Sequence, residues 1–593
     1  MIHPRQIVVT LLLLAAAARA QDWPDGKELS GRLLDLARLD RATVHDLGRS
    51  AGGQKLRLLE VAPLGPGDSG GPAILVLANL EGDLPLASLT AVELAAEVLA
   101  APADQPAARV RWYILPLANP DGLDRWFERP RAADGRNRTP FDDDADGLEG
   151  EDPPDDLDGD GLITWMLVED PAGSWRLTDA GLPVAADPAR GHPGLYRREI
   201  EGRDQDGDGR FNEDPPGGVD VAHNFPHGFK PWRQAGRWPA DQPESRAILE
   251  FAFGHPDVAL VLVLGRDNNL LVLPEPQPDL APGKLVKPNW RLAHDLGLDA
   301  EAEYTLQSVL DAARDRGLSP ATVRARLSLE PIGKPLTEDL RWWGALVDRY
   351  AGYLREHGLD APREAPAAPG DGSAAAWAYF QFGTPAVALD LWSLPAPPDT
   401  AGADTSAAAA TVDPGPEPDP VHVRLQRRTE QNRHAGWRAW TRVTLPDGTA
   451  ALVGGPEPGA VDTPAAYAAQ ERSRAFLPFC LELAGWLPRL ELAPLQLADR
   501  GAGLTEVTAV VRNPGPLPYP TAMGQVNQRP GPVVVTLDGG EPLQCDLRRT
   551  VPGVPAGGAV TLRWLVRTGR PERLAVTATA PGLGTVTVTG GAR

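Results

Sequence analysis

Cysteine is almost absent from this sequence, in which Cys480 and Cys545 are the only two among 593 residues. Two thiols so far apart along the chain offer little cysteine chemistry. In an exported protein they could pair, but the sequence cannot place their β-carbons. A disulfide and two buried free thiols therefore both stay open.

Positive charge is also scarce. The chain has 58 Lys and Arg against 80 Asp and Glu, which gives a net charge of −22. Nucleic-acid binding needs a basic face, so this balance argues against it and also disfavours anionic membrane surfaces. The imbalance is concentrated in residues 141–160, which hold eleven acidic side chains and no basic one.

Long apolar runs are missing, apart from one short run at the start. Arg5 precedes the apolar residues 7–17, and Ala18-Arg19-Ala20 fits a small-x-small cleavage site. This pattern predicts a signal peptide over residues 1–20, so we expect a secreted or periplasmic protein. A membrane anchor is the alternative, but the run falls short of the roughly 20 residues that a span needs.

The length and the apolar pattern predict more than one domain, the first of them α/β. Leu89, Val92, Ala96 and Leu99 share one helical face after an apolar strand, with Ser88 placed to cap the helix. A strand, a helix and a strand with short links predict a parallel or mixed sheet. The expected central strands are residues 72–78, 110–117, 258–264 and 385–391.

The remaining segments complete this plan. Helical patterns cover residues 245–252, much of 300–357, and 472–486. From residue 490 the runs "TEVTAVVRN", "GPVVVTLDG", "AVTLRWLVR" and "RLAVTATA" alternate in period two between Gly and Pro, which is typical of a β-sandwich. We therefore expect an α/β domain over residues 21–489 and a sandwich over 490–593. The first would carry Asp-rich insertions at 141–161 and 203–214 and a Pro/Ala-rich loop at 393–420.

Four segments stand out along the chain: "LANLEGDLP" (77–85), "LPLANPDG" (115–122), "GVDVAHNFPHG" (218–228) and "WAYFQFGTPAVALDLW" (377–392). In this order, they resemble motifs of the zinc carboxypeptidases of the carboxypeptidase A type. The resemblance implies a mixed sheet of about eight strands flanked by helices. It also implies a zinc site at the carboxyl edge of that sheet.

The zinc ligands that the family uses are replaced here. The first family histidine aligns with Glu81, the glutamate with Leu84, and the later histidine with Gly265. Leucine and glycine offer no side-chain ligand, and a catalytic zinc needs about three. Asp83 could only assist Glu81, so we expect no zinc.

The substrate-holding and catalytic positions have changed as well. The family's Asn-Arg pair becomes Ala222-His223, and the segment that carries its carboxylate-binding arginine reads Asp-Gly-Arg-Asn-Arg over residues 134–138. Strict register places Gly135 at that arginine, and a shift of one residue restores Arg136. The catalytic glutamate aligns with Asp390, which keeps a carboxylate but is one methylene shorter. Without a metal to acidify water, this carboxylate is a poor catalyst, and a solvated or hydrogen-bonded strand-end residue is the alternative role.

Histidines elsewhere do not rebuild a metal site. His223 and His227 are four residues apart, but Pro226 lies between them in a segment that the family keeps extended. We expect them to be structural or surface residues.

The acidic segments contain three D-x-D-x-D-G motifs, whose alternate carboxylates converge when the loop curls, as calcium requires. The candidate ligands are Asp142, Asp144, Asp146, Asp156, Asp158, Asp160, Asp204, Asp206 and Asp208. The motifs are not EF-hands, because their twelfth positions are Pro153, Leu167 and Pro215. Asp152, Glu213 or Asp214 could close the shell instead. Calcium would order the insertion and neutralise its repulsion; a solvated acidic loop is the alternative.

Three hypotheses follow. The first is a secreted pseudo-enzyme that has lost zinc and binds peptide or cell-wall termini in the old cleft, or serves a structural role. The second is a working hydrolase that places its metal differently, or that uses Asp390 and Glu81 as a carboxylate pair. The third is a calcium-ordered adhesion or scaffold protein that acts through its β-sandwich.

Overall fold

The computed structural model describes residues 23–65, 71–141, 147, 150, 152–205, 211–212, 217–231, 234–277, 283–318, 322–323, 326–327, 333–359, 372–394, 416–432, 436–543 and 546–591. Several predicted features lie outside these residues, namely the signal peptide 1–20, Asp142, Asp144, Asp146, Asp206, Asp208, Glu213, Asp214 and Cys545. Cys480 is a buried free thiol.

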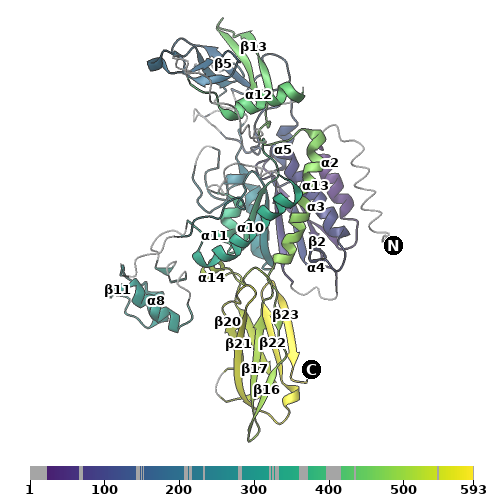
Figure 1. The fold of residues 1–593 in the computed structure, drawn as a ribbon, viewed down its shortest axis with the longest axis vertical. Coiled ribbons are helices and arrows are strands. Elements are labelled where there is room, and N and C mark those ends of the chain that lie inside the picture. The colour runs from purple at the N-terminus through teal and green to yellow at the C-terminus, as the bar shows by residue number, and fades with distance from the viewer. Residues whose placement is uncertain are drawn as a thin grey trace, which may run out of the picture.

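A mixed six-stranded sheet forms the centre of the molecule (Figure 1). Its strands, in spatial order, are β1 (Ala42–Arg49), β2 (Lys55–Val61), β4 (Arg111–Leu115), β3 (Ala73–Ala78), β9 (Val258–Gly265) and β12 (Ala386–Asp390). The pairs from β4 to β12 are parallel, and β1–β2 and β2–β4 are antiparallel. The predicted mixed sheet is thus confirmed, with six strands where the family resemblance implied about eight.

Helices cover this sheet and share its hydrophobic core. They are α2 (Gly26–Leu36), α3 (Pro85–Ala100), α4 (Pro106–Arg109), α5 (Pro120–Trp126), α6 (Pro243–Gly254), α10 (Leu340–His357), α11 (Ala374–Phe380) and α13 (Ala466–Glu482). All six residues of β3 are buried, as expected of a parallel strand covered on both faces. The capping role of Ser88 was predicted wrongly. Helix α3 already begins at Pro85, because proline is pre-organised for the first helical turn, and Ser88 lies buried inside the helix.

A second six-stranded sheet forms at one end of the molecule, from residues between the two expected insertions and from residues after the expected loop 393–420 (Figure 1). Its order is β13 (Trp437–Thr444), β14 (Ala450–Pro456), β5 (Trp165–Glu169), β8 (Tyr196–Ile200), β6 (Trp175–Leu177) and β7 (Pro183–Ala185). Helix α12 (Pro420–Asn432) accompanies it. The sequence analysis did not predict this sheet.

The C-terminal strands form two sheets around a core of their own, at the opposite end of the molecule (Figure 1). One sheet contains β15 (Glu491–Leu492), β16 (Gln496–Gly501), β17 (Leu504–Arg512), β19 (Glu541–Pro542) and β21 (Ala559–Arg567). The other contains β18 (Val533–Asp538), β20 (Arg548–Val551), β22 (Ala575–Ala580) and β23 (Gly584–Thr589). Alternating burial along β17 matches the predicted period of two. The short helix α14 (Ala522–Asn527) faces the α/β part.

A small excursion with a separate apolar core completes the fold. It comprises β10 (Leu285–Val286), α7 (Trp290–Leu296), β11 (Tyr304–Thr305) and α8 (Leu306–Asp315). Five short 3₁₀ turns link the described elements, at Pro188–Arg190, Val221–His223, Thr337–Asp339, Leu483–Trp486 and Pro571–Arg573. Among the helices of the described ranges, none combines the length and the apolar character that crossing a bilayer requires.

Candidate functional site

The chain positions that the family motifs single out meet at one edge of the central sheet. Gly265 ends β9, Asp390 ends β12, and the two are register partners in adjacent parallel strands. Strand β3 ends beside them at Ala78, the partner of Leu264, and leads into the loop that carries Glu81. This is the carboxyl edge, where open α/β sheets place their ligands.

The carboxylate of Glu81 lies over Gly265. Its Oε1 accepts a hydrogen bond from the main-chain N–H of Arg266 at 2.7 Å, and a β-carbon on Gly265 would collide with the same oxygen. Its Oε2 is buried and has no hydrogen-bond partner within the described part of the chain. Burial raises the pKa of Glu81 to about 7, although the positive charge of Arg266 opposes the shift.

The side chain of Arg266 connects this edge to two further carboxylates. Its Nη2 lies 2.7 Å from Asp83 Oδ2, and its Nε lies 2.9 Å from Asp462 Oδ2. Burial disfavours the guanidinium charge, but Asp83, Asp462 and Glu81 outweigh it and raise the pKa of Arg266. Burial also raises the pKa of Asp83, against the pull of the arginine.

Sequence reasoning missed both Arg266 and Asp462. Arg266 directly follows Gly265, the third family ligand position. A basic residue next to a substituted ligand position at a strand end is the sequence signal that could have indicated its role. Asp462 lies 196 residues further along the chain, in a segment without a motif. Nothing in its local sequence indicates this partner.

The second family ligand position is occupied by an apolar side chain. Leu84 is buried, and its main-chain N–H donates to Asn79 Oδ1 at 2.9 Å at the start of α3. The side chain thus extends the hydrophobic core where the family has a carboxylate.

Asp390 is buried in the same sheet edge. Only 3% of it is exposed, and its Oδ1 accepts from the Trp392 main-chain N–H at 3.2 Å. The hydrogen-bonded strand end that we considered as its alternative role matches this environment.

Arg136, the candidate for binding a substrate carboxylate, is held by an acidic neighbour. Its Nε and its main-chain N–H each lie 3.0 Å from Asp134 Oδ1. Arg125 also binds Asp134, at 2.8 Å. Gly135 packs so closely that a β-carbon there would collide with the Glu81 carbonyl. The segment therefore lies beside the Glu81 loop, and an internal carboxylate engages its arginine.

The two histidines of the third motif lie in different environments. His223 contacts Asp220 Oδ2 through Nδ1 at 2.8 Å, and this hydrogen bond, with smaller contributions from Asp267 and Glu81, raises its pKa. His227 instead stacks on Phe380, with ring centroids 4.1 Å apart.

The "NPDG" segment organises loops rather than a substrate. Asn119 caps α5 and donates to the carbonyls of Leu80 and Gly135. Asp121 is fully buried and accepts from the Ser50 hydroxyl at 2.6 Å and from the Gly52 N–H at 2.7 Å. These bonds fix the loops around the sheet edge.

One calcium motif is described in full, and one of its partners was not predicted. Ligand atoms of Asp156, Asp158 and Glu201 all lie within 4.8 Å of one another. Asp160 instead points its Oδ2 to Arg438 Nε, at 3.3 Å. Burial, with Asp160 adding to it, raises the pKa of Asp158. Glu201 lies outside every D-x-D-x-D-G motif, so its role could not be read from the motif alone.

Glu201 and Asp152 brace the second and third motifs in the same way. Glu201 accepts from the N–H groups of Leu157, at 2.7 Å, and Thr164, at 2.9 Å. These are the second and ninth positions of the loop that starts at Asp156.

Asp152 does the same for the loop that starts at Asp204. It accepts from Gln205, at 2.9 Å, and Asn212, at 2.6 Å, again the second and ninth positions. Each bracing carboxylate precedes the other loop in sequence, so the two loops are linked reciprocally. Both oxygens of each bracing carboxylate accept such a bond, in Glu201 as well as in Asp152, which was predicted to close a calcium shell.

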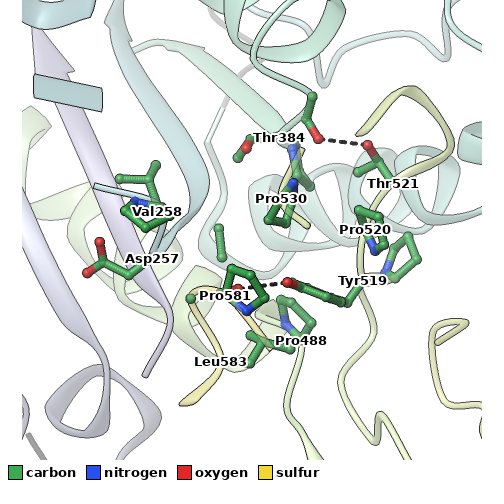
Figure 2. A pocket seen from close by; sticks show the side chains of 16 residues that line it. Asp257, Val258, Thr384, Pro488, Tyr519, Pro520, Thr521, Pro530, Pro581 and Leu583 are labelled. Atoms are coloured by element: carbon green, nitrogen blue, oxygen red, sulfur yellow. Dashed lines mark hydrogen bonds between the residues drawn. The ribbon is translucent and has the colours of Figure 1, made fainter. Parts of the chain in front are cut away.

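A hollow lies at the opposite edge of the sheet, where it meets the C-terminal strands (Figure 2). Prolines dominate its lining, Asp257 is its one titratable acid or base besides Tyr519, and Val258 marks the start of β9. Tyr519 donates to the Pro581 carbonyl at 2.8 Å, and Thr521 donates to the Gly383 carbonyl at 2.9 Å. This hollow lacks a cluster of reactive groups, so the candidate site remains the carboxyl edge.

Comparison with known families supports the motif reading for part of the chain. Residues 33–154 match the family model described as zinc carboxypeptidase, and residues 489–590 match a domain of unknown function, DUF8731. The resemblance to zinc carboxypeptidases is thereby confirmed. No curated protein matches the chain.

Solved carboxypeptidase structures show a partial likeness. Carboxypeptidase A from Helicoverpa armigera is 18% identical, with 45% of this chain and 53% of that one covered and a TM-score of 0.28. Bovine thrombin-activatable fibrinolysis inhibitor is 12% identical, with 46% and 64% covered and a TM-score of 0.26. The match thus spans between half and two thirds of these chains, and at such TM-scores it carries no argument about chemistry.

Proposed function

We propose that this zinc carboxypeptidase-like chain is a secreted or periplasmic protein without peptidase activity. It uses the inherited cleft for binding or for structure. The proposal rests on one observation: the donor atoms at the carboxyl edge do not fit a catalytic zinc.

A catalytic zinc needs about three protein ligands and an open position for water. Of the three family positions, Leu84 and Gly265 have no donor atom in their side chains. Glu81 has two, but one oxygen binds the Arg266 N–H, and the guanidinium charge of that residue lies among the nearby carboxylates. The guanidinium of Arg266 therefore already pairs with the carboxylates that a metal would need as free donors. We infer that the protein has no zinc-dependent hydrolysis.

Asp390 does not replace the missing chemistry. A general base in a peptidase must take a proton from water whose pKa has been lowered, and the metal performs that role in this class. A buried carboxylate that accepts a main-chain hydrogen bond is suited to holding the strand end.

The ligand that we propose for the cleft is a peptide or a cell-wall peptide terminus. The position of the candidate site at the carboxyl edge of the sheet supports this ligand. Because Arg136 is paired with Asp134, we propose that the ligand is bound differently from the substrates of the active enzymes. Titration with a short peptide and with isolated cell-wall fragments tests this part. Lack of binding to both would contradict it.

Calcium is the metal that we propose for the Asp-rich insertion. The convergence of Asp156, Asp158 and Glu201 supports a site of hard oxygen ligands, which calcium prefers. Its role would be to neutralise and order the insertion that leads into β5.

The decisive experiment combines metal analysis with a hydrolysis assay. The purified protein, incubated with zinc and dialysed, is expected to retain no stoichiometric zinc and to leave chromogenic C-terminal peptide substrates intact, while an active zinc carboxypeptidase cleaves them. Release of terminal amino acids that a chelator stops would establish a rearranged metal site and refute the proposal. Chelator-resistant release that Asp390→Asn abolishes would establish a carboxylate-pair hydrolase instead.

A further inference from the structure

The carboxyl edge holds more buried negative charge than its hydrogen bonds neutralise. Glu81 Oε2 and Asp83 Oδ1 are both buried and without a hydrogen-bond partner among the described residues. Asp462 adds a third carboxylate to this group. Carboxylates so close together repel one another unless a cation lies among them.

The cation in this position is a side chain. We propose that Arg266 is the resident cation of the carboxyl edge, and that Asp83 and Asp462 form a guanidinium-binding site, beside Glu81, which the chain fills with its own residue. The proposal rests on the proposed loss of zinc, because a zinc ion and this guanidinium would compete for the same carboxylates.

The contacts of Arg266 tie two distant segments to the end of β9. Its main-chain N–H holds Glu81 and its Nη2 holds Asp83, both in the loop after β3, while its Nε holds Asp462 beyond β14. The side chain alone closes sequence separations of 183 and 196 residues. A zinc site ties loops together in the same manner, so the arginine takes over that structural task as well as the charge.

A guanidinium suits this site better than an ammonium group. The planar guanidinium presents five N–H donors in a fixed geometry, so Nε and Nη2 reach two separate carboxylates at 2.9 and 2.7 Å. A lysine carries the same charge as a single point on a flexible stem. We therefore expect Arg266→Lys to recover only part of the stability that Arg266→Ala loses.

Chemical rescue tests the proposal directly. Arg266→Ala is expected to lower the Tm by about 5 °C or more, because it leaves buried carboxylates unpaired. Millimolar guanidinium or methylguanidinium chloride, far below denaturing concentrations, is expected to restore part of that loss. Sodium chloride at the same concentration is not.

Arg349→Ala is the matched control. Arg349 also forms a two-pronged pair, with Glu482 at 2.6 and 2.7 Å, but near the surface and away from the cleft. Its variant is expected to show no rescue by guanidinium. If Arg266→Ala does not fold, the same titration is made on Arg266→Lys, which keeps the charge.

Different results would contradict the resident-cation proposal and the proposed function. A variant at Arg266 as stable as the parent chain, or a guanidinium response equal to that of Arg349→Ala, would overturn the resident-cation proposal. Rescue by zinc but not by guanidinium would also overturn it, since the site would then be a latent metal site. Stoichiometric zinc and chelator-sensitive hydrolysis in the parent chain would refute the proposed function instead, and these are measured without any variant.

Discussion

The carboxylate of Glu81 occupies the space that the first carbon of a side chain at Gly265 would need. In the zinc carboxypeptidases that the motifs resemble, these two positions supply two of the metal ligands. Here the Glu81 carboxylate can take this position only because residue 265 is a glycine and has no side chain. The residues at these two positions are therefore sterically coupled.

A double-mutant cycle measures this coupling. Gly265→Ala is expected to destabilise the protein by about 1 to 2 kcal/mol, because the methyl group must displace a carboxylate that is held by the Arg266 N–H. In a Glu81→Ala background the same change is expected to cost little, since the space is free. Urea unfolding of the four chains gives the coupling energy. An equal cost of Gly265→Ala in both backgrounds would show that the two side chains do not compete.

The raised pKa of Glu81 predicts a pH-dependent stability. Because burial raises this pKa from 4.5 to about 7, the folded protein binds the proton more tightly than the unfolded chain. The stabilisation is complete below the unfolded pKa and is lost as the pH rises through about 7, by roughly 3 kcal/mol in total. Glu81→Gln, which mimics the protonated form, should therefore unfold with a flatter pH profile over this window.

Urea unfolding at about pH 5 and about pH 8 checks this expectation. The free energy of unfolding of Glu81→Gln, relative to that of the parent chain, should increase as the pH rises. Asp499→Asn, a change at an exposed carboxylate of β16, is a control that should leave the difference unchanged. Parallel pH profiles for Glu81→Gln and the parent chain would disprove the role of Glu81.

The four parallel strands of the central sheet could be predicted from the sequence because they are mostly apolar on both faces, whereas the half-exposed antiparallel strands β1 and β2 were not predicted. The runs that become β3 and β9 contain little else than Val, Leu, Ile and Ala. Covered parallel strands require such runs, and the short strand-helix-strand links then fix the topology. The alternating runs of the C-terminal strands carried the same information for an all-β fold.

The second sheet could not be predicted in the same way. Strand β5 pairs with β14, so that Trp165 lies opposite Gly454, almost 300 residues later in the chain. Hydrophobic periodicity describes a strand and its two faces, but not its partner. The strands between the two predicted insertions, and those after residue 420, were therefore not predicted.

The candidate site shows the same limit. The motifs pointed to Glu81, Leu84, Gly265 and Asp390, and the structure makes Gly265 and Asp390 register partners at the ends of β9 and β12. The role of Arg266 was missed, because it depends on ion pairs with Asp83 and Asp462, which are distant in the sequence and close only in the folded chain.

A buried carboxylate couples the α/β part to the C-terminal strands. Asp339 accepts four hydrogen bonds, from Trp342 and Tyr379 on one side and from the N–H groups of Ala522 and Met523 at the start of α14 on the other. Asp339→Ala leaves these donors unpaired and is expected to cost about 3 to 5 kcal/mol.

Calorimetry would show whether the two parts then separate. Asp339→Ala is expected to split the thermal transition, with the C-terminal strands unfolding apart from the rest. Thr521→Ala, which removes only the cap of α14 and one bond to Gly383, serves as a graded comparison with a cost of about 1 kcal/mol. If both variants unfold in a single transition with equal losses, Asp339 is not the coupling residue.

The calcium proposal predicts a binding stoichiometry. Because all three motifs contribute to a calcium titration, a variant is needed to assign one ion to the motif at Asp156. Calorimetric titration of the parent chain with calcium counts all bound ions. Glu201→Gln is expected to lower that number by one, since this side chain converges with Asp156 and Asp158 and also braces Leu157 and Thr164. A ligand present at about 100 times its Kd stabilises by about 2.7 kcal/mol, so the calcium-induced rise in Tm should shrink in the same variant.

Asp179→Asn is the matched control, because Asp179 is an exposed acid of the same insertion outside the converging group. It should bind as many calcium ions as the parent chain. Magnesium in place of calcium should give a weaker response, since it demands a tighter octahedral arrangement and releases its water reluctantly. Unchanged stoichiometry in Glu201→Gln would mean that the described motif is a solvated acidic loop, and any calcium response would then belong to the motifs at Asp142 or Asp204.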